Sequence, residues 1–401
     1  MIYGVVGLGY GDEGKGKTVA KILYALREHN TARKLVVRYN GGPQAGHSVT
    51  YKGQTHIYSS FGAGTFINEL DADTFWSRFC TFDPVALLKE YKKAEEMFGD
   101  LKTKLYIDHH CPVILPCDKI ANTLPTPNTG LLPENISSSC GSGHGPCVYR
   151  NTETPHRLAV VDLFNMPHSL LVQKIDAINT WYLSSVPAKD HKIIGDLLET
   201  ETDILLKAIR ELKNNTRVLP VSWQWINTYK QWESIVFEGA QGTLLDQHHG
   251  IFPHVTRSNT TFANATVLLK EVNKQFHEIF YVTRAYLTRH GSGPFDALPI
   301  TLKNTDNEIN VTNPAQGEFR TGEINTDLIE YAIDLNRSYL NSSATVGATT
   351  RYTVVVNNLD QVPYPNYFRD YFCNWIDRCF YYSPEITEGL EITDIDNRVN
   401  K

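Results

Sequence analysis

The sequence predicts an α/β fold, with a central, mostly parallel sheet of the P-loop type, helices on both faces and inserted subdomains. Three stretches carry this prediction. An apolar run at 2–6 is followed by a glycine-rich loop and then by a helical pattern at 18–29. Two further apolar runs, 35–39 and 234–237, also end in glycine-rich loops. Loops that follow parallel strands meet at the carboxyl edge of the sheet, where ligands bind.

The other elements are predicted from apolar periodicity and from the turn residues between periodic segments. The predicted helices are 84–97, 158–165, 167–184, 194–213 and 364–383. The further predicted strands are 106–115, 279–285 and 352–356, with a short strand or extended loop at 217–223. The sequence has no internal repeat, so we predict a single domain over 1–401. We expect it to contain a loop- and helix-rich insertion at about 84–230, a C-terminal lobe at about 300–401 and a loosely held polar tail after residue 388.

Composition sets limits on the compartment and the partners. The chain has 401 residues, of which 41% are hydrophobic and 20% charged, as in ordinary globular proteins. A net charge of −6 without a basic run argues against a nucleic acid polymer as a partner. No apolar run reaches the roughly 18 residues of a membrane span, and we expect no signal peptide. Seven cysteines without C-x-x-C pairs favour reduced thiols, so we expect a cytoplasmic protein.

The loop after the first predicted strand has the pattern of a phosphate site. The stretch from Gly11 to Thr18 matches G-x-x-x-x-G-K-T. In such a loop, backbone N–H groups and a helix N-terminus surround an anion, and lysine side chains add positive charge. We therefore predict that this loop binds the phosphates of a nucleotide.

Asp12 and Glu13 do not fit a plain P-loop. A carboxylate beside phosphates is repelled unless Mg²⁺ lies between them or the carboxylate takes a proton. One alternative is a dinucleotide site, because Gly9 to Gly14 also matches G-x-G-x-x-G. That site expects an acid at the end of the second strand, where this chain has Arg38. A tight turn without a ligand is the other alternative, and we prefer phosphate chemistry.

Two later loops add candidate residues. The loop 41–48 carries His47, which is either an acid near Asp12 or a histidine that satisfies a backbone group. The loop 238–246 carries Gln241, whose amide can both donate and accept at a purine edge. Unless they are solvated surface residues, the candidate partners of carboxylates or phosphates are Arg284, Arg289 and Arg320.

Two stretches raise the question of a metal site. His109 and His110 fall on a predicted strand, where neighbouring side chains point to opposite faces, so we do not favour a metal there. Cys140, His144 and Cys147 offer three soft ligands without an obvious fourth. We prefer to interpret this second stretch as a glycine-rich binding loop rather than a zinc site.

Several stretches together resemble the adenylosuccinate synthetase family, in order and rough spacing, over nearly the whole chain. They are Gly11–Lys17, Gly46–His47, Gly145–Pro146, Glu238–Asp246, Val255–Thr256, Ser258–Thr261 and Gly293–Phe295. The first loop and the 238–246 stretch are the most specific. In this family a nucleoside triphosphate phosphorylates the 6-oxygen of a purine monophosphate, and the amine of aspartate then displaces the phosphate.

The resemblance implies a role for each matching residue. Asp12 matches the base that takes the N1 proton, and His47 matches the acid that stabilises the 6-oxygen; Lys15 and Gln241 complete the implied catalytic set. The implied triphosphate contacts are Glu13, Gly14, Lys15, Gly16, Lys17 and Thr18. The implied purine monophosphate contacts are Asp12, Ser139, Cys140, Gln241 and Thr256. The implied aspartate contacts are Gly317, Arg320 and Thr321, and the implied Mg²⁺ contacts are Asp12 and the Gly46 carbonyl. A homodimer is also implied, with an arginine donated across its two-fold axis, for which Arg150 and Arg157 are candidates.

Three departures from the family bear on the substrates. The aspartate loop is short, at 316–322, although Arg320 and Thr321 can still hold a carboxylate. The family reads GTP with T-K-L-D, but the lysine is missing here, so we predict ATP or dATP with base contacts from Asn357, Asn358 and Asp360. The loop 61–65 replaces the usual P-S-G and resembles the phage-type branch, which makes 2-amino-adenylosuccinate from dGMP.

The resulting prediction is a ligase that joins L-aspartate to dGMP at the expense of ATP or dATP. A phage-encoded enzyme of this kind would work in the host cytoplasm, in the modification of DNA with 2-aminoadenine. The alternatives are ordinary adenylosuccinate synthesis from IMP and GTP, a non-catalytic nucleotide-binding regulator, and a kinase or GTPase that uses the P-loop alone.

Overall fold

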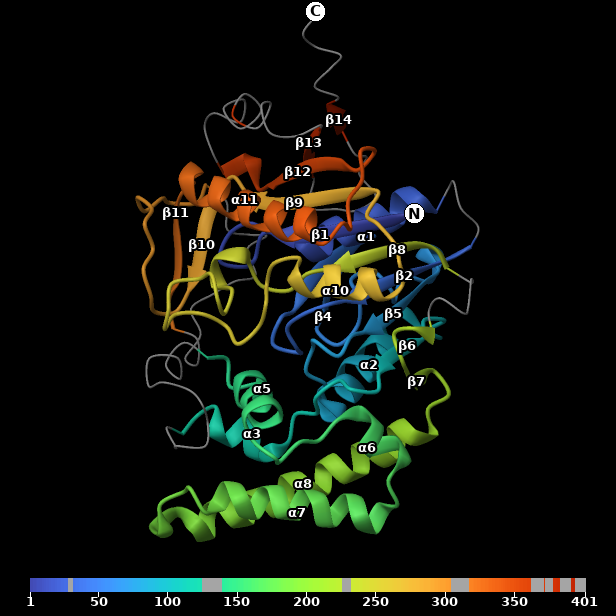
Figure 1. Ribbon diagram of the computed structural model, residues 1–401, viewed down its shortest axis with the longest axis vertical. Coiled ribbons are helices and arrows are strands. Elements are labelled where there is room, and N and C mark those ends of the chain that lie inside the picture. Colours follow the sequence, from blue (N-terminus) through green and yellow to red (C-terminus); the bar gives the residue numbers. More distant parts are fainter. Residues whose placement is uncertain are drawn as a thin grey trace, which may run out of the picture.

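A computed structural model describes residues 1–27, 32–124, 139–225, 232–303, 317–361, 371, 378–382 and 391–393. Within these residues, strands form a ten-stranded sheet in the order β14-β13-β12-β9-β1-β8-β2-β5-β6-β7 (Figure 1). The strands are β1 (Ile2–Gly7), β2 (Arg33–Arg38), β5 (Ala72–Trp76), β6 (Leu105–Asp108), β7 (Val218–Val221), β8 (Trp232–Glu238), β9 (Glu278–Arg284), β12 (Arg351–Asn357), β13 (Arg378–Tyr382) and β14 (Glu391–Thr393). Neighbouring strands are parallel except β13 and β14, so the predicted mostly parallel sheet is confirmed.

Helices cover both faces of this sheet because its strands are apolar on both faces, as expected for buried parallel strands. Neighbouring strand residues point to opposite faces. Val5 packs in one core with Val19 of α1, whereas Val6 packs in a second core with Leu268 of α10 and Ile333 of α11. The helices are α1 (Lys15–Leu26), α2 (Pro84–Phe98), α3 (Pro116–Ala121), α5 (His144–Glu153), α6 (Val160–Asn165), α7 (His168–Leu183), α8 (His191–Asn214), α10 (Ala263–Glu271) and α11 (Thr326–Ser342).

The helices α3 to α8 come between the neighbouring strands β6 and β7 in the chain. In Figure 1 the α7 and α8 helices lie side by side at the end of the molecule opposite β13 and β14. They fall within the predicted insertion, whose exact limits stay a prediction. No helix of the described residues is both long and apolar enough to cross a membrane.

Two small hairpins extend from the carboxyl edge of the sheet. One follows β2 and pairs β3 (His47–Tyr51) with β4 (Gln54–Tyr58). The other follows β9 and pairs β10 (Tyr286–His290) with β11 (Phe319–Glu323). Both hairpins therefore begin where the glycine-rich loops meet.

Some predicted boundaries were wrong. Helix α1 begins at Lys15, directly after Gly14, whose positive φ of 94° ends the preceding loop. The strand predicted over 106–115 ends at Asp108, because the Asp108 carboxylate accepts a hydrogen bond from the His110 N–H at 2.9 Å and closes a turn. His109 and His110 therefore lie in a turn and not on a strand.

The C-terminal predictions are tested only in part. Most of the helix predicted over 364–383 lies outside the described residues, but 378–382 forms β13 and is a strand. Residues 391–393 of the predicted loose tail form β14, which pairs with β13, and the rest of that tail is also outside the described residues.

Candidate active site

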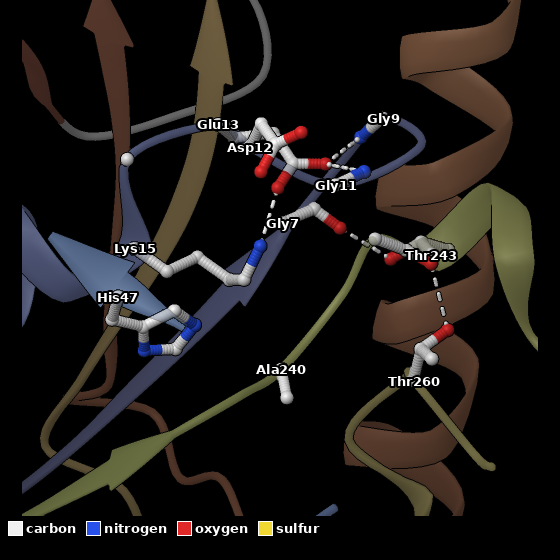
Figure 2. A network of polar contacts seen from close by, with 12 residues as sticks. Gly7, Gly9, Gly11, Asp12, Glu13, Lys15, His47, Ala240, Thr243 and Thr260 are labelled. Carbon is white, nitrogen blue, oxygen red and sulfur yellow. Dashed lines mark hydrogen bonds and ion pairs between the residues drawn. The ribbon is translucent and has the colours of Figure 1, made fainter. Parts of the chain in front are cut away.

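Three glycine-rich loops meet at the carboxyl edge because their strands are neighbours in the order β1-β8-β2. Asn40 follows β2 and Ala240 follows β8, and the two residues exchange hydrogen bonds of 2.8 Å. The Thr243 hydroxyl donates to the Gly7 carbonyl at 2.7 Å (Figure 2). These bonds hold the loops against one another, as the sequence predicts for loops after parallel strands.

Glu13 folds back into its own loop. Its buried carboxylate accepts hydrogen bonds from the N–H groups of Gly9 at 3.0 Å and Gly11 at 2.8 Å, and it pairs with the ammonium group of Lys15 (Figure 2). Glu13 thus offers Lys15 the negative charge that a phosphate group would offer. A phosphate bound at this loop would compete with Glu13 for the same donors.

The start of α1 is packed closely against the second loop. A Cβ on Gly16 would lie 2.3 Å from the Cβ of His47, so only glycine fits there. Thr18 is buried, and its hydroxyl donates to the Gly14 carbonyl at 3.1 Å. Lys17 is partly exposed in the first turn of the helix.

His47 and Glu238 form a buried pair. His47 Nδ1 lies 2.5 Å from Glu238 Oε1, and Glu238 Oε2 accepts the Ala63 N–H at 3.0 Å. Burial raises the pKa of the Glu238 carboxyl, but attraction to His47 and to Arg38 outweighs burial and leaves that pKa below its ordinary value. Burial lowers the pKa of His47 despite the attraction of Glu238. The pair is therefore a neutral imidazole that donates Nδ1–H to a carboxylate, and Nε2 keeps a lone pair.

Asp12 has a different histidine as its partner. Its Oδ2 lies 3.1 Å from Nε2 of His290, and the side chains are 31% and 20% exposed. The Asp12 carbonyl accepts a hydrogen bond from Arg284 Nε at 2.5 Å, and Asp12 has a positive φ of 63°. Burial raises the pKa of the Asp12 carboxyl, but the hydrogen bond from His290 and the charge of Arg284 outweigh burial, so this pKa lies below its ordinary value. Asp12 is thus a carboxylate at neutral pH, and within the described residues no protein group bonds to its Oδ1.

The sequence predicts His47 near Asp12, and the structure gives each residue its own partner. The positive charge of Lys15 contributes to lowering the pKa of both Asp12 and His47. The sequence analysis did not find His290 or the role of Glu238. Each residue ends a strand at this edge, and that position is the available signal, but nothing in the spacing indicates which histidine would meet which carboxylate.

Two of the predicted purine monophosphate residues are brought together. Gln241 has a positive φ of 61°, and its Nε2 donates to the Thr256 hydroxyl at 2.8 Å. Within the described residues, Gln241 Oε1 is buried without a hydrogen-bond partner. Ser139 and Cys140 lie in a separate turn before α5, where the Ser139 hydroxyl accepts a hydrogen bond from Asn122 at 2.5 Å. Their contact with a monophosphate stays a prediction.

The predicted aspartate residues lie on the second hairpin. Arg320 Nη1 donates to the Gly293 carbonyl at 3.0 Å, and Nη2 donates to the Gly291 carbonyl at 2.6 Å. The Thr321 hydroxyl donates to a backbone carbonyl at 3.0 Å. Gly317, with a φ of 88°, precedes the strand. The residues before Gly317 in this loop lie outside the described part of the chain.

Asn357 lies against the phosphate loop. Its Nδ2 donates to the Glu13 carbonyl at 2.7 Å, and a Cβ on Gly14 would lie 2.7 Å from the same nitrogen. Among the residues that the structure describes, Asn357 Oδ1 is buried without a hydrogen-bond partner. Asn358 is partly exposed with a φ of 59°, and the side chain of Asp360 is outside the described residues. Among the three predicted base contacts, Asn358 is therefore the remaining candidate whose side chain is described.

Arg150 is not available to a second subunit, which corrects one expectation. Its buried guanidinium pairs with Asp118, with Nε–Oδ1 at 2.9 Å and Nη2–Oδ2 at 2.7 Å, and also donates to the Val113 carbonyl. Removing this arginine would leave a buried carboxylate without its partner, so its role is to hold α3 and α5 together. Arg157 is exposed.

The Cys140–Cys147 stretch begins α5 against the second loop. His144 Nδ1 lies 2.9 Å from the Thr81 hydroxyl, and a Cβ on Gly42 would lie 3.2 Å from the same nitrogen. Burial raises the pKa of the Cys147 thiol well above its ordinary value. Within the described residues, no group of three or more His, Cys, Asp or Glu side chains could hold a metal ion.

Comparisons with known proteins identify the family of the chain. A family model described as adenylosuccinate synthetase matches residues 4–341. The adenylosuccinate synthetase of Flavobacterium johnsoniae is 29% identical over 378 residues, which cover 90% of this chain and 84% of that protein. The adenylosuccinate synthetase of Chlorobaculum parvum is 32% identical over 294 residues, which cover 73% of this chain and 63% of that protein, less than two thirds of its length.

Two solved structures share the fold. The fully ligated adenylosuccinate synthetase from Plasmodium falciparum aligns with a TM-score of 0.65 and 18% identity, over 97% of this chain and 86% of that one. The succinoaminodeoxyadenylate synthetase of cyanophage S-2L, bound to dGMP and to dATP as an energy donor, aligns with a TM-score of 0.65 and 17% identity, over 98% of this chain and 97% of that one. The family model covers most of the chain. The chain therefore belongs to the adenylosuccinate synthetase family of carbon–nitrogen ligases.

Proposed function

We propose that this ligase joins L-aspartate to C6 of dGMP, with ATP or dATP as the phosphate donor, and releases 2-amino-2′-deoxy-N6-succinoadenylate, the nucleoside diphosphate and phosphate. The observation that carries the reaction type is the carboxylate of Asp12. It lies in the predicted phosphate loop, it is ionised, and within the described residues only its Oδ2 has a protein partner. A base that takes a proton beside a phosphate needs these properties.

In the first step, Asp12 Oδ1 takes the N1 proton of the purine. The electrons shift to the 6-oxygen, which attacks the γ-phosphorus of the triphosphate, and the bond to the bridging oxygen breaks. Lys15 would leave Glu13 and pair with the transferred phosphoryl group, because phosphoryl transfer depends on positioning and charge neutralisation. Gln241 Oε1, which has no protein partner, would orient the base.

In the second step, the neutral amine of aspartate attacks C6, the carbon–oxygen bond breaks so that phosphate leaves, and the nitrogen gives one proton to the departing phosphate. Arg320 and Thr321 would hold the aspartate carboxylates. His47 lies at the 6-oxygen in this proposal. The negative charge that arrives there raises the proton affinity of the His47 imidazole, which takes a proton from water at Nε2 and donates it in a hydrogen bond to the 6-oxygen. Glu238 stabilises the imidazolium that results.

The residues fit a magnesium ion. Within the described residues Asp12 Oδ1 has no protein partner, and its two lone pairs allow it to meet N1–H with one and the ion with the other; Gly46 lies exposed on the second loop with a carbonyl to offer. Mg²⁺ prefers such oxygen ligands and takes the others from substrate phosphates and water, so a site with few protein ligands is expected. When bound, the ion would supply positive charge that offsets the negative charge of the phosphates.

Two observations support the proposed nucleotides. The base-reading loop has no lysine, and Asn357 is committed to the phosphate loop, so a neutral amide of Asn358 is left for an adenine edge. The fold neighbour of nearly equal extent, from cyanophage S-2L, is bound to dGMP and dATP. A second candidate is adenylosuccinate synthesis from IMP and GTP, because the curated relatives carry that name.

The proposal includes a homodimer in the cytoplasm, or in the host cytoplasm for a phage enzyme. With Arg150 committed to Asp118, Arg157 is the exposed candidate for an arginine donated to the partner's site. Size-exclusion chromatography with light scattering would measure the oligomeric state. A monomer that is fully active would contradict this part of the proposal.

The test of the function is a substrate matrix. Phosphate release with aspartate present would be measured for IMP, GMP and dGMP, each with GTP, ATP and dATP. We expect the highest kcat/KM for dGMP with ATP or dATP. Preference for IMP with GTP would assign ordinary adenylosuccinate synthesis, and nucleotide binding without turnover would assign a regulator. Hydrolysis that does not depend on aspartate would assign a kinase or GTPase.

A further inference from the structure

A cavity lies at the amino edge of the sheet, at the end of the strands away from the candidate active site. It has a volume of about 410 Å³ and is lined by residues from two segments, 270–277, which leads from α10 into β9, and 343–350, which leads from α11 into β12. The strands β9 and β12 are parallel neighbours, so both segments lie at the same edge. Pockets for small molecules have volumes of about 300–1,000 Å³, so this cavity can hold a small molecule.

The walls of the cavity carry positive charge and no carboxylate. Lys270 and Lys274 line it, and both residues are exposed. Within the described residues neither ammonium group has an ion-pair partner. The acids that flank this segment in the sequence, Glu271 and Glu278, each pair with an arginine instead, and Glu233 lines a neighbouring hollow but not this cavity. The cavity therefore offers two positive charges that the protein itself does not neutralise.

His277 adds a donor to the same wall. Its Nδ1 accepts the Ile2 N–H at 3.0 Å, so the neutral ring carries its hydrogen at Nε2. Burial lowers the pKa of His277, and nearby positive charges, including those of Lys274 and Arg351, lower it further, so the ring is neutral at neutral pH. The bond to Ile2 thus fixes the tautomer in which Nε2–H can donate to a ligand.

The two segments are joined to each other without a ligand. Gln275 Nε2 donates to the Ala344 carbonyl at 3.0 Å, and the Phe276 N–H donates to the Thr345 carbonyl at 2.8 Å. The Thr350 hydroxyl donates to the Phe276 carbonyl at 2.8 Å. Ala344 has a positive φ of 54°, a backbone conformation that is found at ligand sites more often than elsewhere. The walls are therefore preorganised, which favours binding because a ligand does not have to order them.

These groups determine the chemistry of the ligand. Ammonium groups bind phosphate oxygens as point charges, in hydrogen bonds that are stronger than those between neutral groups. The remaining polar side chains of the cavity, such as those of Asn273 and Thr349, suit hydroxyl groups and further oxygens. An apolar ligand would leave the two charges without a partner. The cavity is thus suited to a small polar anion with more than one negative charge.

We propose that this cavity is a second anion site, which binds a small phosphorylated molecule through Lys270, Lys274 and the Nε2–H of His277. None of the residues predicted for the active site lines it. The inference therefore does not depend on the proposed ligase reaction or on its substrates. A failure of either proposal leaves the other standing.

The test uses inorganic pyrophosphate as the probe and reads each lysine separately. The full chain is acetylated with an N-hydroxysuccinimide ester, with and without pyrophosphate, and mass spectrometry gives the rate at each lysine. At about ten times the Kd, the rates at Lys270 and Lys274 should fall about 10-fold, because about a tenth of the sites remain empty. Lys207 and Lys213, which are exposed on α8, are the controls and should react at unchanged rates. Unchanged rates at Lys270 and Lys274, or an equal decrease at all four lysines, would overturn the inference.

Calorimetry of pyrophosphate binding at 0.15 M salt gives the second readout. Replacement of both cavity lysines, Lys270→Ala with Lys274→Ala, should lower the number of bound pyrophosphates by one or raise the Kd at this site at least about 10-fold. The matched control, Lys207→Ala with Lys213→Ala, removes the same charge from α8 and should leave the isotherm unchanged. Pyrophosphate at the phosphate loop appears in both variants, so it does not affect the comparison. Identical isotherms of the cavity variant and the wild type would contradict the site, and equal protection of Lys270 and Lys274 by citrate would overturn the assignment to phosphate.

Discussion

Two histidine–carboxylate pairs lie at the same edge of the sheet, and they differ in how completely the protein satisfies them. In the first pair, His47 and Glu238 are 8% and 0% exposed, and both carboxylate oxygens have protein partners. In the second pair, Asp12 and His290 are 31% and 20% exposed. Each side chain has one polar atom that no other described residue bonds. We call these the closed pair and the open pair.

The difference follows from where the residues come from. Glu238 ends a central strand of the sheet and His47 begins the hairpin after a neighbouring strand, so the closed pair is built from the core. The open pair joins a loop residue with positive φ to the end of the other hairpin. A closed pair fixes the orientation and protonation of its histidine, whereas an open pair keeps atoms for a ligand. We therefore expect stability to depend more on the first pair than on the second, although His47 of the first pair also has a proposed role at the 6-oxygen.

The largest expected effect is on turnover, at the open pair. Asp12→Ala should lower kcat by about 10²–10⁴-fold, because it removes a positioned base. The melting temperature should change little, since the side chain is partly exposed. Steady-state phosphate release and a thermal melt measure both. A variant with more than a tenth of wild-type turnover would show that Asp12 is not the base.

The next effect is on stability, at the closed pair. Glu238→Ala should lower the free energy of unfolding by about 3–5 kcal/mol, because it leaves the buried charge of Arg38 without a nearby carboxylate. Glu238→Gln is the matched control, since it keeps the size and an acceptor for the Ala63 N–H. Urea denaturation gives the values. Equal stability of Glu238→Ala and the wild type would contradict the structural role of the closed pair.

Much of the fold could be predicted from the sequence, because local patterns specify it. The strands at 2–6, 234–237, 279–285 and 352–356 are short apolar runs that end in turn residues, and each lies in the central sheet. The errors occur where tertiary contacts decide. The strand after residue 105 is cut short by the carboxylate of Asp108, and residues 378–382 become a strand because they pair with β12.

The candidate site was predictable to the level of loops, not of contacts. Three strand-to-glycine loops indicated the carboxyl edge, and the structure brings them together. The charged groups that meet in the site are far apart in the sequence. The spacing of residues within one loop therefore does not predict which of them come into contact. Glu13 illustrates this point, since the sequence suggests a phosphate ligand while the fold turns its carboxylate onto Lys15.

A third histidine sharpens the comparison, because it is buried without a carboxylate. Burial lowers the pKa of His144 from an ordinary 6.5 to about 4. Below pH 6.5 the unfolded chain therefore binds a proton at His144, whereas the folded chain does not bind it until the pH is near 4. Stability should fall as the pH drops from about 6.5 to about 4, by up to about 3 kcal/mol from this group.

The measurement is urea denaturation at pH 7 and pH 4.5, for the wild type and His144→Gln. The glutamine has no proton to gain, so the variant should lose less stability between the two pH values than the wild type does. His47→Gln is the comparison from the closed pair, where the carboxylate of Glu238 partly offsets burial. An equal pH dependence of His144→Gln and the wild type would assign the slope to other groups.

The smallest expected effect is at Arg320, on the second hairpin. Arg320→Ala should raise the KM for aspartate about 10-fold and leave the nucleotide KM values nearly unchanged. A charge-assisted hydrogen bond to a carboxylate contributes more than a neutral one, but both Nη atoms already donate to the carbonyls of Gly291 and Gly293, so only part of that energy depends on the substrate. About 1.4 kcal/mol corresponds to the tenfold change. Arg210→Ala, at an exposed position on α8, is the control for loss of a positive charge. If the nucleotide KM values rise instead, Arg320 acts by holding the 291–294 turn beside His290, and the aspartate would have to bind elsewhere along this edge.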